Sequence, residues 1–148
     1  MVILKQPDEI AIARASNRIV AEVLSVLREK VKPGVTTLEL DQIAERTAEK
    51  RGAMPAFKGY RGYPYALCAS INEEVVHGMP SKRVLMEGDI IGLDFGVYYQ
   101  GFYGDSAITL PVGRVNAGAA RLMEVTEKSL YEAIRQTSAG NRLGDISA

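Results

Sequence analysis

The sequence predicts an α+β domain, because two amphipathic helical patterns precede a run of strand patterns and a third helical pattern follows it. Helices and strands that are grouped along the chain, rather than alternating one by one, are typical of α+β folds. The chain has 148 residues and no low-complexity segment or interdomain linker. We therefore expect one domain over residues 1–148.

The first helix is expected from about Asp8 to Val31, where apolar residues recur at helical spacing and Pro7 suits the first turn. A Lys-Pro-Gly sequence ends it. A second helix begins near Thr36, since Thr36 and Glu39 stand three apart as a capping box requires, and a glycine at position 52 closes it.

Residues 53–65 contain two prolines, two glycines and three tyrosines, which predicts a loop that carries large rings. It is either a surface loop packed on the protein or a ligand-binding loop. Strands are expected over 66–72, 89–98 and 102–110, the last two as a hairpin around Gln100-Gly101. A third amphipathic helix is expected over 117–137.

The segment after the first helix resembles the segment after the third. In each, a glycine (Gly34 or Gly140) is followed five residues later by an acid (Glu39 or Asp145) and then an aliphatic residue. A second copy of the architecture then begins near the end of the chain, as internal duplication predicts. We expect the chain to be a fragment of a longer protein.

The most informative pair of residues is Asp94 and Asp105, each within a predicted strand. A turn at Tyr99-Gln100 places them directly opposite one another, and a turn at Gln100-Gly101 offsets them by two; both place them on one face, roughly 5–8 Å apart. Two close carboxylates raise one another's pKa, and a divalent cation relieves the repulsion. The alternative is that both are exposed or cap turns, although aspartate is disfavoured within strands.

The only histidine, His77, lies where a strand gives way to a Gly-Met-Pro sequence, from which it could point into a cleft. A hydrogen-bonded structural role is the alternative. Cys68 reads as a small buried residue. One histidine and one cysteine do not suffice for a zinc finger, and nothing marks a catalytic triad.

Composition excludes several classes of protein. The 18 basic and 18 acidic residues balance, so no large field favours nucleic acid or anionic membrane. A single cysteine suits a reducing compartment, and the sequence shows neither a signal-peptide pattern nor a long apolar span. We expect a cytoplasmic protein that neither reads nucleic acid sequence nor binds membrane.

Several motifs in order resemble the N-terminal part of the bacterial-type methionine aminopeptidase family (type I), in the class without an N-terminal zinc-binding extension. They are Lys32–Leu40, Gly59–Pro64, Ser70–Pro80, the Asp94 and Asp105 pair, and Gly140–Ile146. The similarity covers essentially the whole chain.

The resemblance implies the pita-bread (creatinase/aminopeptidase) fold, whose two similar α+β halves enclose two divalent metal ions. The chain corresponds to the first half plus the opening helix of the second. Asp94 and Asp105 would be metal ligands, and His77 the catalytic residue that binds substrate and assists proton transfer. The pocket for the methionine side chain would be lined by Phe57, Tyr60, Tyr63 and Cys68. Cobalt, manganese, iron and zinc all suit such oxygen-rich sites.

The implied activity is hydrolytic removal of the N-terminal methionine from nascent polypeptides, with those chains and the ribosome as partners. The family's remaining histidine and glutamate ligands have no counterpart in residues 1–148, so we expect this chain alone to be inactive or nearly so. Two alternatives stay open: another pita-bread peptidase, such as an Xaa-Pro aminopeptidase, and a non-catalytic binding protein on the same fold.

Overall fold

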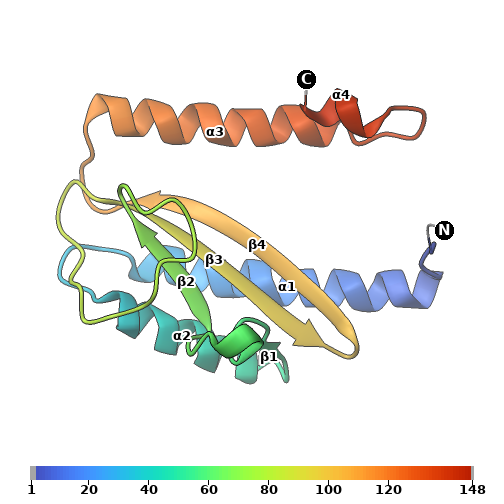
Figure 1. The fold of residues 1–148 in the computed structure, drawn as a ribbon, viewed down its shortest axis with the longest axis horizontal. Helices are drawn as coiled ribbons and strands as arrows, with labels where there is room; N and C mark the ends of the chain where they lie inside the picture. Colours follow the sequence, from blue (N-terminus) through green and yellow to red (C-terminus); the bar gives the residue numbers. More distant parts are fainter. Residues whose placement is uncertain (1–2, 148) are drawn as a thin grey trace. The chain divides into compact units, whose positions relative to one another are not determined.

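The computed structural model describes residues 3–147 and divides into two compact units after Arg114. The first unit contains helices α1 (Pro7–Lys30) and α2 (Thr37–Glu49) and the 3₁₀ turn η1 (Tyr60–Gly62) (Figure 1). Its four strands are β1 (Met54–Pro55), β2 (Leu67–Ile71), β3 (Ile90–Tyr99) and β4 (Phe102–Pro111). The second unit contains helices α3 (Ala117–Gln136) and α4 (Leu143–Ser147). The α+β class is confirmed. The single domain over residues 1–148 stays a prediction.

Strand β3 is the centre of the antiparallel sheet. Strand β4 pairs with it along its whole length, from Ile90↔Pro111 to Tyr99↔Phe102. Strands β2 and β1 pair with successive parts of β3, at residues 91–95 and 97–98. Because β4 spans both parts, β1 and β2 must lie along the other edge of β3.

One face of the sheet packs on α1 and α2, which lie together on one side of it in Figure 1. Alternate residues of β3 point to these helices and are fully buried: Ile91, Leu93, Phe95 and Val97. The helices contribute an apolar stripe at helical spacing, with Val20, Val23, Leu27, Leu40 and Ala44 all fully buried. The opposite face of β3 carries Ile90, Gly92, Asp94, Gly96 and Tyr98, of which only Asp94 is charged.

Most predicted element bounds agree with the structure within one or two residues, and α2 ends three residues before Gly52. The loop over 53–65 differs more, since it contains both β1 and η1. Sequence patterns could not show β1, because it is only two residues long and its Pro55 has no N–H to donate.

The two similar segments have the same local geometry. The Glu39 carboxylate accepts from the Thr36 N–H (2.7 Å), and the Asp145 carboxylate accepts from the Arg142 N–H (2.7 Å). Gly34 and Gly140, which precede these contacts, have φ of 91° and 98°. A helix does begin at residue 143, as the repeat predicted. The local match supports an internal duplication.

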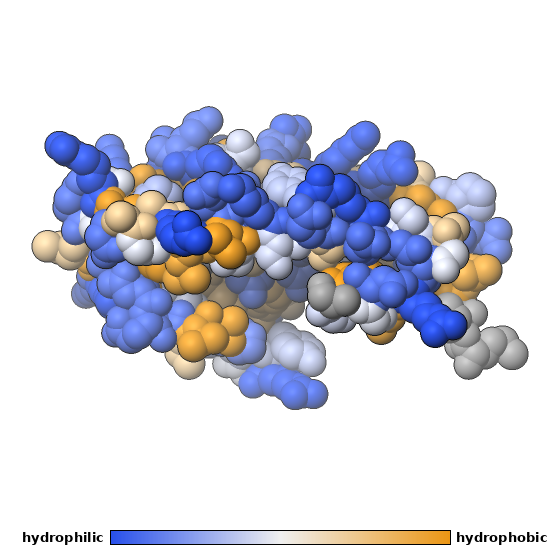
Figure 2. All heavy atoms as spheres, turned by 90° about the horizontal axis from the view of Figure 1, so that it is seen from above, coloured by the Kyte–Doolittle hydropathy of each residue, from blue (hydrophilic) through white to orange (hydrophobic). Residues whose placement is uncertain are grey.

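Helix α3 has no buried residue and exposes a set of large apolar side chains: Leu122, Val125, Leu130, Tyr131 and Ile134. Hydrophobic side chains lie scattered among hydrophilic ones on the face of the molecule seen in Figure 2.

Of the helices in residues 3–147, none is both long and apolar enough to cross a bilayer.

Replacing Gly104 of β4 by alanine should destabilise the first unit by roughly 1–3 kcal/mol. A Cβ at this position would lie 2.8 Å from the Ser16 carbonyl carbon, so α1 would have to move off the sheet. Urea denaturation measures the change. Gly92→Ala in β3 is the matched control, because a Cβ there meets nothing closer than 3.7 Å. Equal stability of the two variants would contradict this packing account.

Candidate functional site

Asp94 and Asp105 project from neighbouring strands onto the face of the sheet opposite the helices. Asp94 pairs with Ala107, and Asp105 pairs with Gly96, so the two aspartates are offset by two residues on one face. The turn at Gln100-Gly101, one of the two predicted turns, is therefore the one present. The two carboxyl groups are within hydrogen-bonding reach of one another.

This proximity changes the acidity of Asp94. Partial burial and the negative charge of Asp105 raise the pKa of Asp94 from 3.8 to about 6, and the nearby His77 lowers it slightly. A carboxyl with such a pKa is half protonated near pH 6. A cation placed between the two carboxylates would remove the repulsion.

Cys68 of β2 lies directly opposite Asp94 and faces the same side of the sheet. Its side chain is buried, and burial raises the pKa of the thiol, so it stays protonated at neutral pH. A buried, protonated thiol behaves as a small apolar surface. This agrees with the prediction that Cys68 is a buried residue and not a nucleophile.

Phe57 covers the sheet next to the aspartates. Its ring carbon Cε1 lies 2.8 Å from where a Cβ on Gly96 would be, so only glycine at position 96 lets the ring come this close. Gly92 and Gly96 both lie on the same strand face as Asp94. Phe57 fills the space beside Gly96, whereas a Cβ on Gly92 would meet nothing closer than 3.7 Å.

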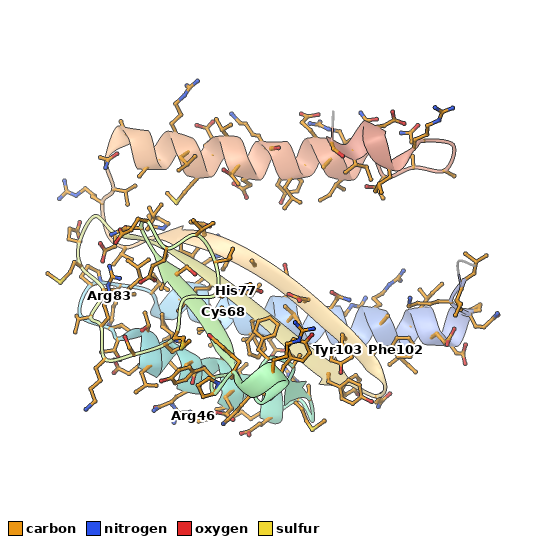
Figure 3. All side chains as sticks on the ribbon, in the orientation of Figure 1. Arg46, Cys68, His77, Arg83, Phe102 and Tyr103 are labelled. Atoms are coloured by element: carbon orange, nitrogen blue, oxygen red, sulfur yellow. The ribbon has the colours of Figure 1, made fainter. Side chains whose placement is uncertain are left out.

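Tyr63 and His77 approach the same region from two loops. The Tyr63 hydroxyl donates toward the carbonyl oxygens of Leu67 (2.9 Å) and Gly78 (3.2 Å). His77 is exposed, and Figure 3 shows it close to Cys68 in the view; a hydrogen bond between Ala69 and Gly78 joins their two segments. The structure thus gathers Phe57, Tyr63, Cys68 and His77 around the two aspartates.

Tyr60 is the one predicted pocket residue that this cluster does not include. Its side chain is 65% exposed, and the Arg61 guanidinium lies 5.4 Å from the centre of its ring. No contact seen in residues 3–147 joins Tyr60 to the two aspartates. Its predicted role in the pocket stays a prediction.

Asp41 of α2 supports the site, and the sequence patterns did not identify it. It is 5% exposed, and its Oδ1 accepts from the backbone N–H groups of Ala66 (2.8 Å) and Leu67 (2.9 Å). It therefore fixes the start of β2, the strand that carries Cys68. No local signal reveals this contact, because its partners lie 25 and 26 residues away in the sequence.

Residues 11–148 match the sequence model of metallopeptidase family M24. The chain belongs to metallopeptidase family M24. Among curated M24-type relatives, methionine aminopeptidase 1 of Bacillus subtilis is 50% identical over 147 residues, which is 99% of this chain and 59% of that protein. The methionine aminopeptidase of Aquifex aeolicus is 49% identical and covers 94% of this chain and 57% of that protein.

Solved structures agree. A methionine aminopeptidase from Thermotoga maritima matches with a TM-score of 0.96 and 42% identity, over 99% of this chain and 59% of that one. Aminopeptidase P from E. coli shares the fold, with a TM-score of 0.85 and 22% identity over 97% of this chain and 32% of that one. The predicted pita-bread fold and the resemblance to methionine aminopeptidases are both confirmed. The chain spans about three-fifths of the length of its curated relatives.

Family M24 implies divalent metal ions, and the donor set present fits part of such a site. Asp94 and Asp105 offer oxygen ligands of like charge within hydrogen-bonding reach, which is the chemistry that a hard divalent cation stabilises. Within residues 3–147, no three or more His, Cys, Asp or Glu side chains are grouped so as to hold a metal ion. The pair is therefore a partial ligand set.

The raised pKa of Asp94 should make stability depend on pH. The folded carboxyl has a pKa of about 6 and the unfolded one 3.8, so the folded state alone takes up a proton as pH falls through 6. By linkage, this group makes the protein more stable at pH 4 than at pH 8. After allowance for solvent screening, the effect should be about 1 kcal/mol.

Asp94→Asn provides the test. In EDTA, the variant should be more stable than the wild type at pH 8, and the difference should shrink toward pH 4, where the wild-type carboxyl is also neutral. Urea denaturation across this pH range measures the free energy of unfolding of both proteins. The contributions of the other carboxylates cancel when the two free energies are subtracted. A difference that does not vary with pH would contradict the assignment.

Proposed function

We propose that this chain supplies part of the active site of a dinuclear metal aminopeptidase that removes the N-terminal methionine from nascent polypeptides. The observation that carries the proposal is the pair of aspartates, Asp94 and Asp105, on one sheet face and within hydrogen-bonding reach. The 50% identity to a methionine aminopeptidase over 99% of the chain supports the choice of substrate.

Asp94 and Asp105 would hold two divalent ions through their carboxylate oxygens, as the resemblance to methionine aminopeptidases implies. Cobalt, manganese, iron and zinc all accept such oxygen ligands. When bound, the ions supply Lewis acidity and lower the pKa of water. Two carboxylates alone hold a metal pair weakly, so the complete site needs further ligands.

His77 would bind the substrate and assist proton transfer. It is the only histidine in the sequence, its side chain is exposed, and it lies near enough to Asp94 to influence that pKa. An imidazole changes its charge between pH 5 and 8, which suits a group that gives and takes protons at neutral pH.

The substrate's methionine side chain would lie among Phe57, Tyr60, Tyr63 and Cys68. The Phe57 ring and the protonated Cys68 thiol offer an apolar wall next to the aspartates. Thioethers are polarizable and make favourable contacts with aromatic ring edges. A pocket of rings and sulfur therefore favours methionine over charged side chains. The cytoplasm, where nascent chains emerge from the ribosome, is the compartment in which this reaction is needed.

An Xaa-Pro aminopeptidase is the alternative that the sequence left open. The X-Pro aminopeptidase of Thermotoga maritima shares the fold with a TM-score of 0.75, but its identity to this chain is 21%, which supports the fold alone. A non-catalytic binding protein on this fold would be expected to lose site residues. Here Asp94, Asp105 and His77 are all present.

A chimera tests the activity. Residues 1–148 joined to the part of the Bacillus subtilis methionine aminopeptidase 1 that they do not match should hydrolyse Met-Ala-Ser. Asp94→Asn or Asp105→Asn should lower kcat/KM by at least ~100-fold, because each removes a metal ligand. Glu29→Gln, an exposed acid of α1, is the control that should leave activity unchanged. Faster hydrolysis of Xaa-Pro peptides would overturn the proposal.

The chain by itself should bind Mn²⁺ weakly and hydrolyse Met-Ala-Ser barely or not at all, because it carries a partial ligand set. Titration followed by the EPR signal of free Mn²⁺ measures the affinity. Asp105→Asn should weaken it at least ~10-fold, whereas Glu29→Gln should not change it. Tight, stoichiometric binding with full peptidase activity would contradict the partial-site account.

A further inference from the structure

The segment that carries His77 turns back along the outer edge of β2. The N–H of Ala69 donates to the Gly78 carbonyl (2.9 Å), and the N–H of Gly78 donates to the Ser70 hydroxyl (3.0 Å). Gly78 thus occupies the place of a neighbouring strand residue. A Cβ at Gly78 would lie 2.3 Å from the Ala69 carbonyl oxygen, so no other residue allows this approach.

The backbone of His77 is held in an unfavourable conformation. Its φ is +59°, a left-handed value that is uncommon for residues other than glycine. Such a conformation is strained and persists only where the surroundings hold it. Residues 72–77 are all exposed, so burial of their side chains does not supply that support. At the start of the segment, Asn72 Oδ1 accepts from the Ile90 N–H (3.0 Å) and the Glu74 carboxylate accepts from the Ile71 N–H (2.8 Å). Next to His77, the hydrogen bonds that hold the segment are made by Gly78.

The Tyr63 hydroxyl is placed to support the His77 backbone through Gly78. It shares one proton between the carbonyl oxygens of Leu67 (2.9 Å) and Gly78 (3.2 Å). Leu67 directly precedes Cys68, and Gly78 directly follows His77. Burial raises the pKa of Tyr63, so the hydroxyl stays protonated and can donate at any working pH. One side chain therefore joins the aromatic loop, β2 and the His77 segment.

We propose that Tyr63 is a positioning residue for His77: its hydroxyl holds the Gly78 carbonyl against β2 and so fixes the backbone from which the imidazole projects. This role belongs to the hydroxyl, whereas the pocket-lining role under Proposed function belongs to the ring. The catalytic consequence rests on the proposed function; the structural consequence does not.

Tyr63→Phe separates the two roles, because it keeps the ring and removes only the hydroxyl. Tyr65→Phe is a matched control. Tyr65 lies in the same loop with its ring edge-on to Tyr63 at 6.1 Å, and its hydroxyl makes no hydrogen bond within residues 3–147. Both substitutions remove one phenolic oxygen from neighbouring rings.

The first experiment measures amide hydrogen exchange and His77 ring signals by NMR in the 148-residue chain. Since His77 is the only histidine in the sequence, its imidazole signals can be assigned directly. In Tyr63→Phe, protection of the Ala69 N–H should fall about 2–10-fold, the effect of one neutral hydrogen bond. The His77 signals should shift, while the protection of Phe95 in the core stays unchanged. Tyr65→Phe should change none of these.

Two outcomes would overturn the proposal. Unchanged Ala69 protection and His77 signals would show that the hydroxyl does not hold the segment. An equal loss of protection at Ala69 and Phe95 would show that Tyr63 stabilises the whole unit and has no particular effect on His77. Neither outcome depends on enzymatic activity.

The second experiment uses the chimera. In Tyr63→Phe, kcat for Met-Ala-Ser should fall roughly tenfold with KM changed less than about twofold, because the pocket ring is kept while the proton-transfer group loses its support. A raised KM with unchanged kcat would overturn the positioning role. An inactive chimera whose Tyr63→Phe exchange data match the expectation would refute the proposed function and leave the hydroxyl contact confirmed.

Discussion

The two-residue turn at Gln100 and Gly101 fixes the register of β3 and β4, and the site depends on that register. Both residues have positive φ, 48° and 90°, as the tight turns that join twisted antiparallel strands require. A shift of one residue in this pairing would move Asp105 to the helix-covered face. The same turn thus buries Leu93 and Phe95 and brings the two aspartates together on the other face.

Close approach at three glycines then builds the site around this hairpin. Gly104 admits the backbone of α1 at Ser16, Gly96 admits the Phe57 ring, and Gly78 admits the carbonyl of Ala69. Each contact is closer than any side chain would allow. The molecule pairs these close contacts with a carboxylate pair whose repulsion opposes folding at neutral pH, an arrangement typical of sites that bind a cation.

Local patterns in the sequence were sufficient for the helices, the three longer strands and the shared face of Asp94 and Asp105. They left two registers open, because the choice depends on which two residues adopt positive φ. Long-range contacts were beyond their reach: the Asp41 bonds to β2, the Phe57 ring on Gly96 and the Tyr63 bond to Gly78 join segments 15 to 39 residues apart. The pocket roles came from resemblance to a family, since spacing alone does not reveal what a loop tyrosine contacts.

The most direct test of the account is to locate a bound cation on the chain. Paramagnetic Mn²⁺ added in small amounts to the ¹⁵N-labelled protein broadens the amide signals nearest to it. The account predicts that broadening is strongest around Asp94 and Asp105 in the middle of the hairpin and is lost in Asp94→Asn. Broadening centred on the exposed Glu73 and Glu74, in the segment that precedes His77, with the hairpin unaffected, would contradict it.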